Sequence, residues 1–409
     1  MNFKNVLLDV LLGFILPLVI GFLVMWKLFL TPGTIFHGDL EILFSVSSLL
    51  SELNYAWIPQ VSSGWGYNAV PWILILMFAK LFGLPNDLTV KLWVLLSFAL
   101  SSFFIYLTLR LLLPKKEKRM HYIACLMGLF TYMFNQVVIS ELIVPNMLLS
   151  FSALPLFSIL FVRFIQQKKY KDTLEYIVGI AVISMFLSIY PPPLFFAILF
   201  VIFYFTYRTL KYKATLIIKD LSRTALMLFI FVLSNSFWII PMLYTILYIP
   251  ESIGTLYAQS PFSLQELYAA WNAAHGWNTI NSLGLIGGFG WPYNQQPPNI
   301  ISASLSLVLP ILAFFSILLF KRFDSLTRKY IFFHSIAFLF FMTFADRDKP
   351  FIDLVADLSY LIWYSGMPLK SQLWTLIKQP SLFLPVIPYF YAFFIGSIVL
   401  MILRTSSKA

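Results

Sequence analysis

Long apolar runs alternate with short charged breaks along the chain. Several runs reach the roughly 20 residues that a helix needs to cross about 30 Å of hydrocarbon. A helix satisfies its backbone hydrogen bonds internally, so we expect each run to be helical. The breaks predict about ten membrane-spanning helices, at residues 6–30, 88–113, 120–140, 147–165, 173–190, 194–210, 224–248, 301–320, 330–345 and 381–404. The pattern therefore predicts an all-α polytopic membrane protein.

Two further apolar patterns suit helices that lie along the membrane surface. The run 71–84 has only 14 residues, which is too few to span the bilayer. Between residues 38 and 55, leucine and phenylalanine recur near the helical period, which is typical of an amphipathic helix. We expect both segments to be in-plane juxtamembrane helices on the outer face.

The composition supports the membrane class, since 60% of the 409 residues are hydrophobic, 18% are aromatic and only 11% are charged. A soluble chain of this length needs far more polar surface. The one cysteine, Cys125, excludes an internal disulfide framework and a cysteine-based metal site. Because Cys125 lies in an apolar run, we expect it to be buried.

The net charge of +11 is distributed as in a membrane protein rather than as in a nucleic-acid-binding protein. Basic residues concentrate in short breaks such as 115–119 and 168–171. With a cytoplasmic N-terminus, 21 of the 28 basic residues fall inside with six acidic residues, and seven fall outside with 11 acidic residues. This asymmetry predicts that both termini are cytoplasmic, and the apolar richness suits a multi-pass protein of the plasma membrane.

Three outer segments, 31–87, 249–300 and 346–380, are too long to be mere connections, whereas the inner connections have about 7 to 13 residues. Long irregular segments on a rigid scaffold often carry function. We therefore expect one transmembrane domain, residues 1–409, whose active-site face is formed by these three segments.

The first outer segment begins with His37-Gly38-Asp39 after the first span, and its second in-plane helix ends in Phe82-Gly83. A first span followed by a carboxylate and by in-plane helices resembles the GT-C superfamily of membrane glycosyltransferases. The resemblance implies a polyprenyl-phosphate sugar as donor and an acceptor on the outer face. It also implies that an acidic residue here acts as base or as metal ligand, and the matching position is Asp39, with Glu41 two residues further on as a further catalytic candidate. The alternative role of Asp39 is a helix cap.

Two further short motifs are similar to the same superfamily. The outer turn 141–146 begins with Glu141, where relatives often carry a second functional carboxylate. The segment 376–383 resembles an Arg-x-Pro-x-x-Phe pattern, with Lys378 in place of the arginine, so bidentate phosphate binding is not implied. We expect the donor phosphate to be bound by Lys378, Lys370 and Arg347, whose alternative role is that of surface charges near lipid head groups.

Glycosyl transfer requires a base for the acceptor hydroxyl, positive charge or a metal for the leaving phosphate, and a surface that holds sugars. Aromatic rings and asparagines alternate in segment 249–300, which suits the sugar surface. Its candidate sugar-binding residues are Trp271, His275, Trp277, Asn278, Trp291 and Tyr293. An aromatic belt at the membrane interface is the alternative. The resemblance leaves Mg²⁺ or Mn²⁺ open as a cofactor, and we assign no metal ligands.

We therefore expect a glycosyltransferase that moves a hexosyl or pentosyl group, with inversion, from a polyprenyl-phosphate donor to an extracytoplasmic glycan, lipid or protein. Its expected partners are this donor, membrane lipids and a membrane or extracytoplasmic protein, and no nucleic acid. One alternative is a lipid-linked saccharide flippase or transporter, a class that often carries charged relays within the membrane. His334 is the one candidate relay, and we expect it to be a hydrogen-bonded core residue instead. The other alternative is a non-catalytic membrane subunit of a larger complex.

Overall fold

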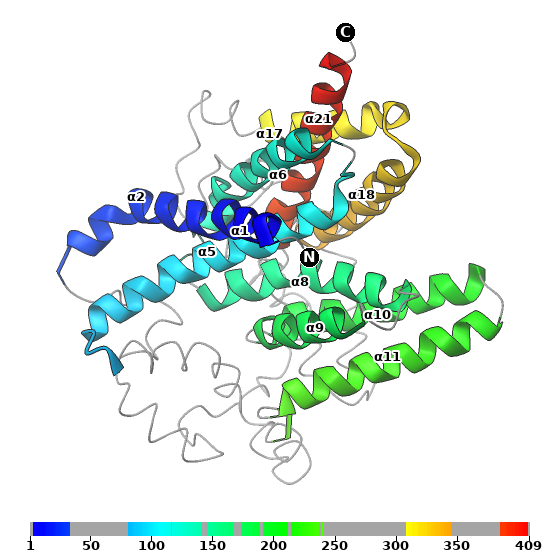
Figure 1. Cartoon of the computed structure of the whole chain (residues 1–409), viewed down its shortest axis with the longest axis horizontal. Helices are drawn as coiled ribbons and strands as arrows, with labels where there is room; N and C mark the ends of the chain where they lie inside the picture. The colour runs from blue at the N-terminus through cyan, green and yellow to red at the C-terminus, as the bar shows by residue number, and fades with distance from the viewer. Residues whose placement is uncertain are drawn as a thin grey trace, which may run out of the picture. The chain divides into compact units, whose positions relative to one another are not determined.

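Helices make up the part of the chain that the structure, a computed structural model, describes. That part comprises residues 3–32, 81–115, 117–140, 142, 145–166, 173–188, 191–211, 214–236, 239–240, 308–345 and 385–407, and it contains no strand. In chain order (Figure 1) its elements are α1 (Phe3–Val10), the π-helical turn η1 (Leu11–Ile15), α2 (Leu16–Leu30), α5 (Asn86–Leu112), α6 (Lys118–Met133), α7 (Gln136–Ser140), α8 (Pro145–Gln166), α9 (Thr173–Leu187), α10 (Pro191–Lys211), α11 (Ala214–Ser234), α17 (Val308–Leu318), the 3₁₀ turn η5 (Phe320–Arg322), α18 (Ser325–Ala345) and α21 (Ile387–Ser406). The all-α prediction is confirmed for these residues.

A helix lies at the position of each of the ten apolar runs. By length and composition, four helices among the described residues can cross a membrane, namely Asn5–Leu30, Asp87–Leu112, Pro145–Gln166 and Ile387–Ser406. Two shorter helices, Leu174–Leu187 and Phe196–Tyr207, are also apolar. The structure thus supports a helical membrane protein with four candidate spans, and the count of about ten spans stays a prediction.

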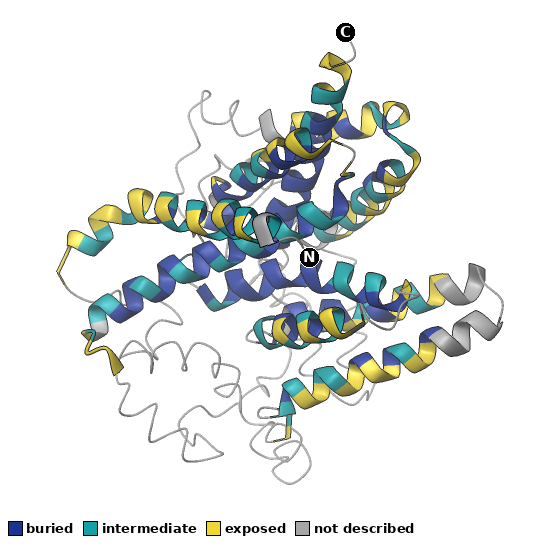
Figure 2. Cartoon of the chain, in the orientation of Figure 1, coloured by how far each residue is buried: buried dark blue, intermediate teal, exposed yellow. Residues whose placement is uncertain are grey.

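Large apolar side chains lie on the surface of several helices. On α2, Leu23 is 62% exposed, and only 17% of the most apolar stretch of the first candidate span is buried. Figure 2 shows exposed positions along α2, α11 and α18, whereas α8 is mostly buried. Soluble proteins rarely expose apolar surface on this scale, and a lipid environment removes its cost.

Two apolar runs differ from the helices that occupy them. The run 120–140 is interrupted at Phe134 and Asn135, where the Asn135 side chain accepts a hydrogen bond from the Val137 backbone nitrogen (2.9 Å) and so begins α7. Helix α11 begins at Ala214, ten residues before the expected start of its span at 224. The charged residues that end the apolar run there do not end the helix, and one of them, Arg223, donates to the Ile165 carbonyl of α8 (2.6 Å).

The helices form two compact units, of which unit 1 comprises Met1–Thr108 and Leu142–Ser252. Here the N-terminal helices pack closely on α5. A Cβ atom added to Gly13 would lie 2.5 Å from a ring carbon of Tyr106, and one added to Gly21 would lie 2.8 Å from Phe98. Helix α8 packs against α9 and α10, and α11 packs against α9. Helix α10 begins at Pro191, the first of three consecutive prolines and three residues before the expected start of its span at 194.

Unit 2 comprises Leu109–Glu141 and Ile253–Ala409. Its central helix is α21, which packs along α6 and also contacts α17 and α18. The backbones of α6 and α21 lie close together at Gly128, where an added Cβ atom would lie 2.5 Å from the Ala392 carbonyl oxygen. Cys125 lies on the same stretch of α6 and is fully buried, which confirms the prediction. The prediction of one transmembrane domain is not tested by this division.

Candidate functional site

The residues predicted to perform chemistry lie outside the described part of the chain. They are Asp39, Glu41 and Glu141 as catalytic residues, Arg347, Lys370 and Lys378 for the donor phosphate, and Trp271, His275, Trp277, Asn278, Trp291 and Tyr293 for the sugar. Their roles therefore stay predictions. The structure does describe both ends of the first outer segment, 31–87, and the helices that carry them.

A buried lysine joins the two ends of this segment. Lys91 of α5 is 3% exposed, and its Nζ donates to the Thr31 carbonyl oxygen at 2.6 Å. The same Nζ lies 3.8 Å from a carboxylate oxygen of Asp87. Thr31 follows the last residue of α2, and Asp87 lies in the first turn of α5. Lys91 therefore closes the segment 31–87 at its base, and we refer to these three residues as the Lys91 bridge.

The local sequence explains why the bridge forms. Asp87 and Lys91 are four residues apart and share one face of α5, and an acidic residue in the first turn suits the positive end of the helix dipole. The carbonyl groups that follow the end of α2 lack intrahelical partners, and a cation is favourable at that end. A buried ammonium group is costly without such partners. The bridge is therefore a specific anchor, and its loss would leave a buried charge unpaired.

The described residues just before α5 agree with the expected end of the in-plane helix 71–84. Leu81 is helical, Phe82 and Gly83 form a turn, and Gly83 has a φ of 71°. This left-handed conformation favours glycine because it has no Cβ atom. The helix therefore ends at the residues that the sequence indicated, while the rest of 71–84 lies outside the described residues.

A second polar contact fixes the first helix of unit 1 against α5. The Tyr106 hydroxyl donates to the Asp9 carboxylate at 3.0 Å, and the Tyr106 side chain is fully buried. Tyr106 and Lys91 lie at opposite ends of the part of α5 that belongs to unit 1. Polar contacts from Asp9 in α1 and from Thr31 at the end of α2 therefore hold the N-terminal helices against α5.

The histidine in α18 is hydrogen-bonded, as predicted, and it is half-buried rather than in the core. His334 Nδ1 lies 2.7 Å from the Tyr330 carbonyl oxygen, which can only accept, so this nitrogen carries the proton. His334 Nε2 then accepts a hydrogen bond from the Tyr389 hydroxyl at 2.5 Å. The imidazole also stacks on Phe393 with ring centroids 4.0 Å apart. Both ring nitrogens are occupied, so the residue stabilises the pairing of α18 with α21.

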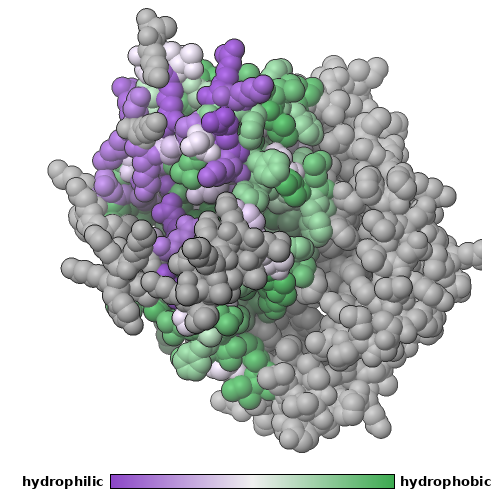
Figure 3. All heavy atoms as spheres, turned by 90° about the vertical axis from the view of Figure 1, so that its right-hand side faces the viewer, coloured by the Kyte–Doolittle hydropathy of each residue, from purple (hydrophilic) through white to green (hydrophobic). Residues whose placement is uncertain are grey.

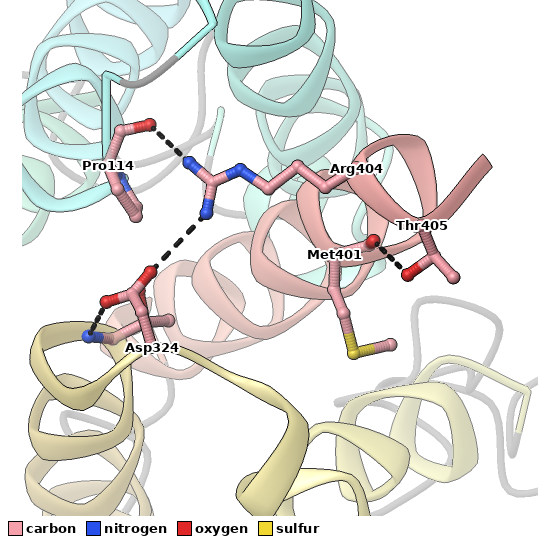
Figure 4. A network of polar contacts seen from close by, with 6 residues as sticks. Pro114, Asp324, Met401, Arg404 and Thr405 are labelled. Atoms are coloured by element: carbon pink, nitrogen blue, oxygen red, sulfur yellow. Dashed lines mark hydrogen bonds and ion pairs between the residues drawn. The ribbon is translucent and has the colours of Figure 1, made fainter. Parts of the chain in front are cut away.

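An arginine near the end of α21 gathers three segments of unit 2 (Figure 4). Arg404 donates to the Pro114 carbonyl oxygen (3.2 Å) and pairs with the Asp324 carboxylate (3.4 Å). Asp324 also accepts hydrogen bonds from the backbone nitrogen and the hydroxyl of Thr327, at 3.0 Å and 3.1 Å, and so caps α18. The ends of α5, α18 and α21 are thereby held together.

Sequence reasoning missed these anchors to different degrees. The spacing of Asp87 and Lys91 is a recognisable helical pair, and it could have been noted. No local pattern relates Arg404 to Asp324, because 80 residues separate them. Among the described residues, no group of three or more histidine, cysteine, aspartate or glutamate side chains is placed to hold a metal ion.

Comparison with protein-family models, with curated proteins and with solved structures finds no match to this chain.

Proposed function

We propose that the protein is a membrane glycosyltransferase of the GT-C type. It transfers a sugar from a polyprenyl-phosphate donor to an acceptor on the outer face of the plasma membrane. The segment 31–87 supplies the catalytic carboxylate, Asp39, with Glu41 beside it and Glu141 from a second outer turn. In this proposal the termini are cytoplasmic and the three long outer segments surround the reacting sugar.

The observation that carries the proposal is the Lys91 bridge. A catalytic carboxylate must be held in reach of one hydroxyl, so the segment that carries it needs a fixed base. Lys91 provides this by binding the residues where the segment leaves α2 and enters α5. The helix end at Leu81 and the positive φ of Gly83 agree with the layout on which the resemblance rests.

The proposed reaction is a single displacement. The acceptor hydroxyl oxygen attacks the anomeric carbon, and the bond from that carbon to the phosphate oxygen breaks. The hydroxyl proton passes to the Asp39 carboxylate, and polyprenyl phosphate leaves with the electron pair. Lys378, Lys370 and Arg347 stabilise the charge on the departing phosphate, and the aromatic residues of 249–300 hold the sugars. One displacement inverts the configuration at the anomeric carbon.

The test uses the purified full-length protein, a labelled polyprenyl-phosphate sugar and a candidate acceptor. Asp39→Asn retains the size of the side chain and its capping ability but removes the proton acceptor. General base catalysis is worth about 10²–10⁴-fold, so the transfer rate should fall by about that factor. Glu52→Gln is the matched control, because it removes another carboxylate of the same segment that has no proposed role.

Three results would contradict the proposal. Full transfer activity of Asp39→Asn would exclude its carboxylate as the base. An equal loss of activity in Glu52→Gln would show that the segment tolerates no change of charge, rather than that Asp39 is special. Transport of the lipid-linked sugar without any transfer would favour the flippase alternative.

A further inference from the structure

The polar end of unit 2 around Arg404 is strongly basic. The Arg404 contacts bring together three segments. The first comprises residues 113–115 and 117–119, the second residues 319–329 and the third residues 401–407. These segments contain two acidic residues, Glu117 and Asp324, and one of them is already paired with Arg404. Their eight basic residues are Lys115, Lys118, Arg119, Lys321, Arg322, Arg328, Lys329 and Arg404. We call this end of unit 2 the Arg404 surface.

Several basic side chains of the Arg404 surface are exposed. Lys321, Arg322 and Lys329 are exposed, as are the three basic residues from the segment that precedes α6 and from its first turn. Arg404 is different, because its guanidinium is used to hold the segments in place. The surface thus has an internal cation, Arg404, that holds the segments together, and exposed cations, of which Lys321, Arg322 and Lys329 lie next to the turn between α17 and α18.

Exposed apolar side chains follow these charged residues directly along α18 and lie next to Arg404 on α21. On α18, Phe332 is 54% and Phe333 is 50% exposed, three and four residues after Lys329. Each residue of a helix advances about 1.5 Å, so the apolar surface starts within roughly 6 Å of the last basic residue. On α21, Ile402 is 53% exposed, two residues before Arg404. Figure 3 shows hydrophilic residues gathered at the upper end of the face it presents and apolar residues below them.

This order of charge and apolar surface matches the order of groups in a phospholipid. The phosphate of a lipid lies at the boundary between water and the acyl chains, where Lys and Arg side chains bind anionic head groups. The exposed apolar side chains of α18 and α21 would contact the chains of the same lipid. An excess of six positive charges selects an anionic head group over a zwitterionic one.

We propose that the Arg404 surface binds the phosphates of anionic phospholipids in the leaflet at this end of unit 2. The lipids bridge the loop before α6 and the turn between α17 and α18, two segments that Arg404 holds close together. This binding is independent of the proposed glycosyl transfer and does not depend on which leaflet faces the cytoplasm.

The experiment measures how many lipids remain bound to the full-length protein, and how tightly, by native mass spectrometry from detergent. The protein is titrated with phosphatidylglycerol or with phosphatidylcholine of the same acyl chains. Each basic residue near an anionic surface strengthens binding about fivefold, so the triple variant Lys321→Gln, Arg322→Gln, Lys329→Gln should bind phosphatidylglycerol roughly a hundredfold more weakly. Its affinity for phosphatidylcholine should not change.

Two controls test whether the loss of lipid binding is due to the charge of these side chains rather than to their shape, and whether it is specific to the Arg404 surface. The variant Lys321→Arg, Arg322→Lys, Lys329→Arg preserves the charge and should retain the preference for phosphatidylglycerol. Lys27→Gln removes an exposed cation of unit 1 and should have no effect on binding at the Arg404 surface. All three substituted residues of the surface are exposed, so the unfolding midpoint in detergent without lipid should be unchanged in both triple variants.

Several results would overturn the proposal. The triple glutamine variant would do so if it bound phosphatidylglycerol as tightly as the unaltered protein. Equal affinity of the unaltered protein for the two lipids would show that the charge does not select the head group. Displacement of phosphatidylglycerol by millimolar inorganic phosphate, at matched ionic strength, would identify a site for soluble phosphate instead of a lipid surface.

Discussion

Substitution of Gly128 by alanine tests the packing of α6 against α21. The new Cβ atom would lie 2.5 Å from the Ala392 carbonyl oxygen and 2.8 Å from a methyl group of Leu109. Ordinary contacts begin near 3.4 Å, so the two helix backbones must separate by several tenths of an ångström or more. Overpacking of this kind costs about 1–3 kcal/mol, and alanine returns up to about 1 kcal/mol through its higher helix propensity. We expect Gly128→Ala to destabilise unit 2 by about 1–2 kcal/mol.

The one cysteine of the protein offers a direct assay. Cys125 is fully buried and lies one turn before Gly128 on α6, so a thiol-reactive dye labels it only when this helix pair opens. A loss of about 1–2 kcal/mol raises the open population, and therefore the labelling rate, roughly 5- to 30-fold. Labelling is measured in detergent under conditions where the dye reacts slowly compared with reclosing of the helices.

Neighbouring substitutions serve as controls for Gly128→Ala. Met127→Ala alters a residue that is 43% exposed on the same helix, so the labelling rate should remain close to that of the unaltered protein. Gly396→Ala places a Cβ atom 3.1 Å from the Ala124 carbonyl oxygen and should give an intermediate rate. If Gly128→Ala were labelled no faster than Met127→Ala, the close backbone approach would be wrong.

Three further outcomes are expected. Tyr106→Phe removes the hydroxyl that donates to Asp9 and should lower the free energy of unfolding by about 1–3 kcal/mol in chemical denaturation, since hydrogen bonds to charged groups are worth that much; no change would show that the contact is not formed. Gly83→Ala should cost about 1–2 kcal/mol through its positive φ alone, because nothing lies within 4 Å of the added atom, whereas Gly83→Asn should cost less; equal effects would contradict the left-handed turn. With the native cysteine replaced, an impermeant maleimide added to intact cells should label His275→Cys and not Glu117→Cys, and labelling of the latter would reverse the proposed orientation.

The helices could be predicted from the sequence because a membrane span leaves a strong and local signal. A helix lies at the position of each of the ten apolar runs. The break at Asn135 and the early start of α11 at Ala214 were not predicted. At Asn135 the helix boundary is set by a side-chain hydrogen bond that hydropathy does not record.

The candidate site was less accessible to sequence reasoning. Asp39 was chosen from its place after the first span, and no described contact tests its role. The anchors that position the helices depend on partners distant in the chain, as with Lys91 and Thr31, which are 60 residues apart. From the sequence alone, a lysine near the end of an apolar run is interpreted as a charge at the membrane–water boundary. Its partner becomes visible only when the helices are packed.

The Lys91 bridge also bears on how much change the chain tolerates between residues 31 and 87. Because the bridge fixes where the segment leaves α2 and enters α5, the residues between these anchors can change in number with little effect on the helices. Doubling the length of such a loop adds only about 0.6 kcal/mol of closure entropy. The stretch between the anchors can therefore be exchanged or lengthened as long as Asp87, Lys91 and the backbone carbonyl of residue 31 keep their places. A chimaera that receives the whole stretch between the anchors should fold, whereas one joined inside α5 between Asp87 and Lys91 would take the two members of the ion pair from different parents.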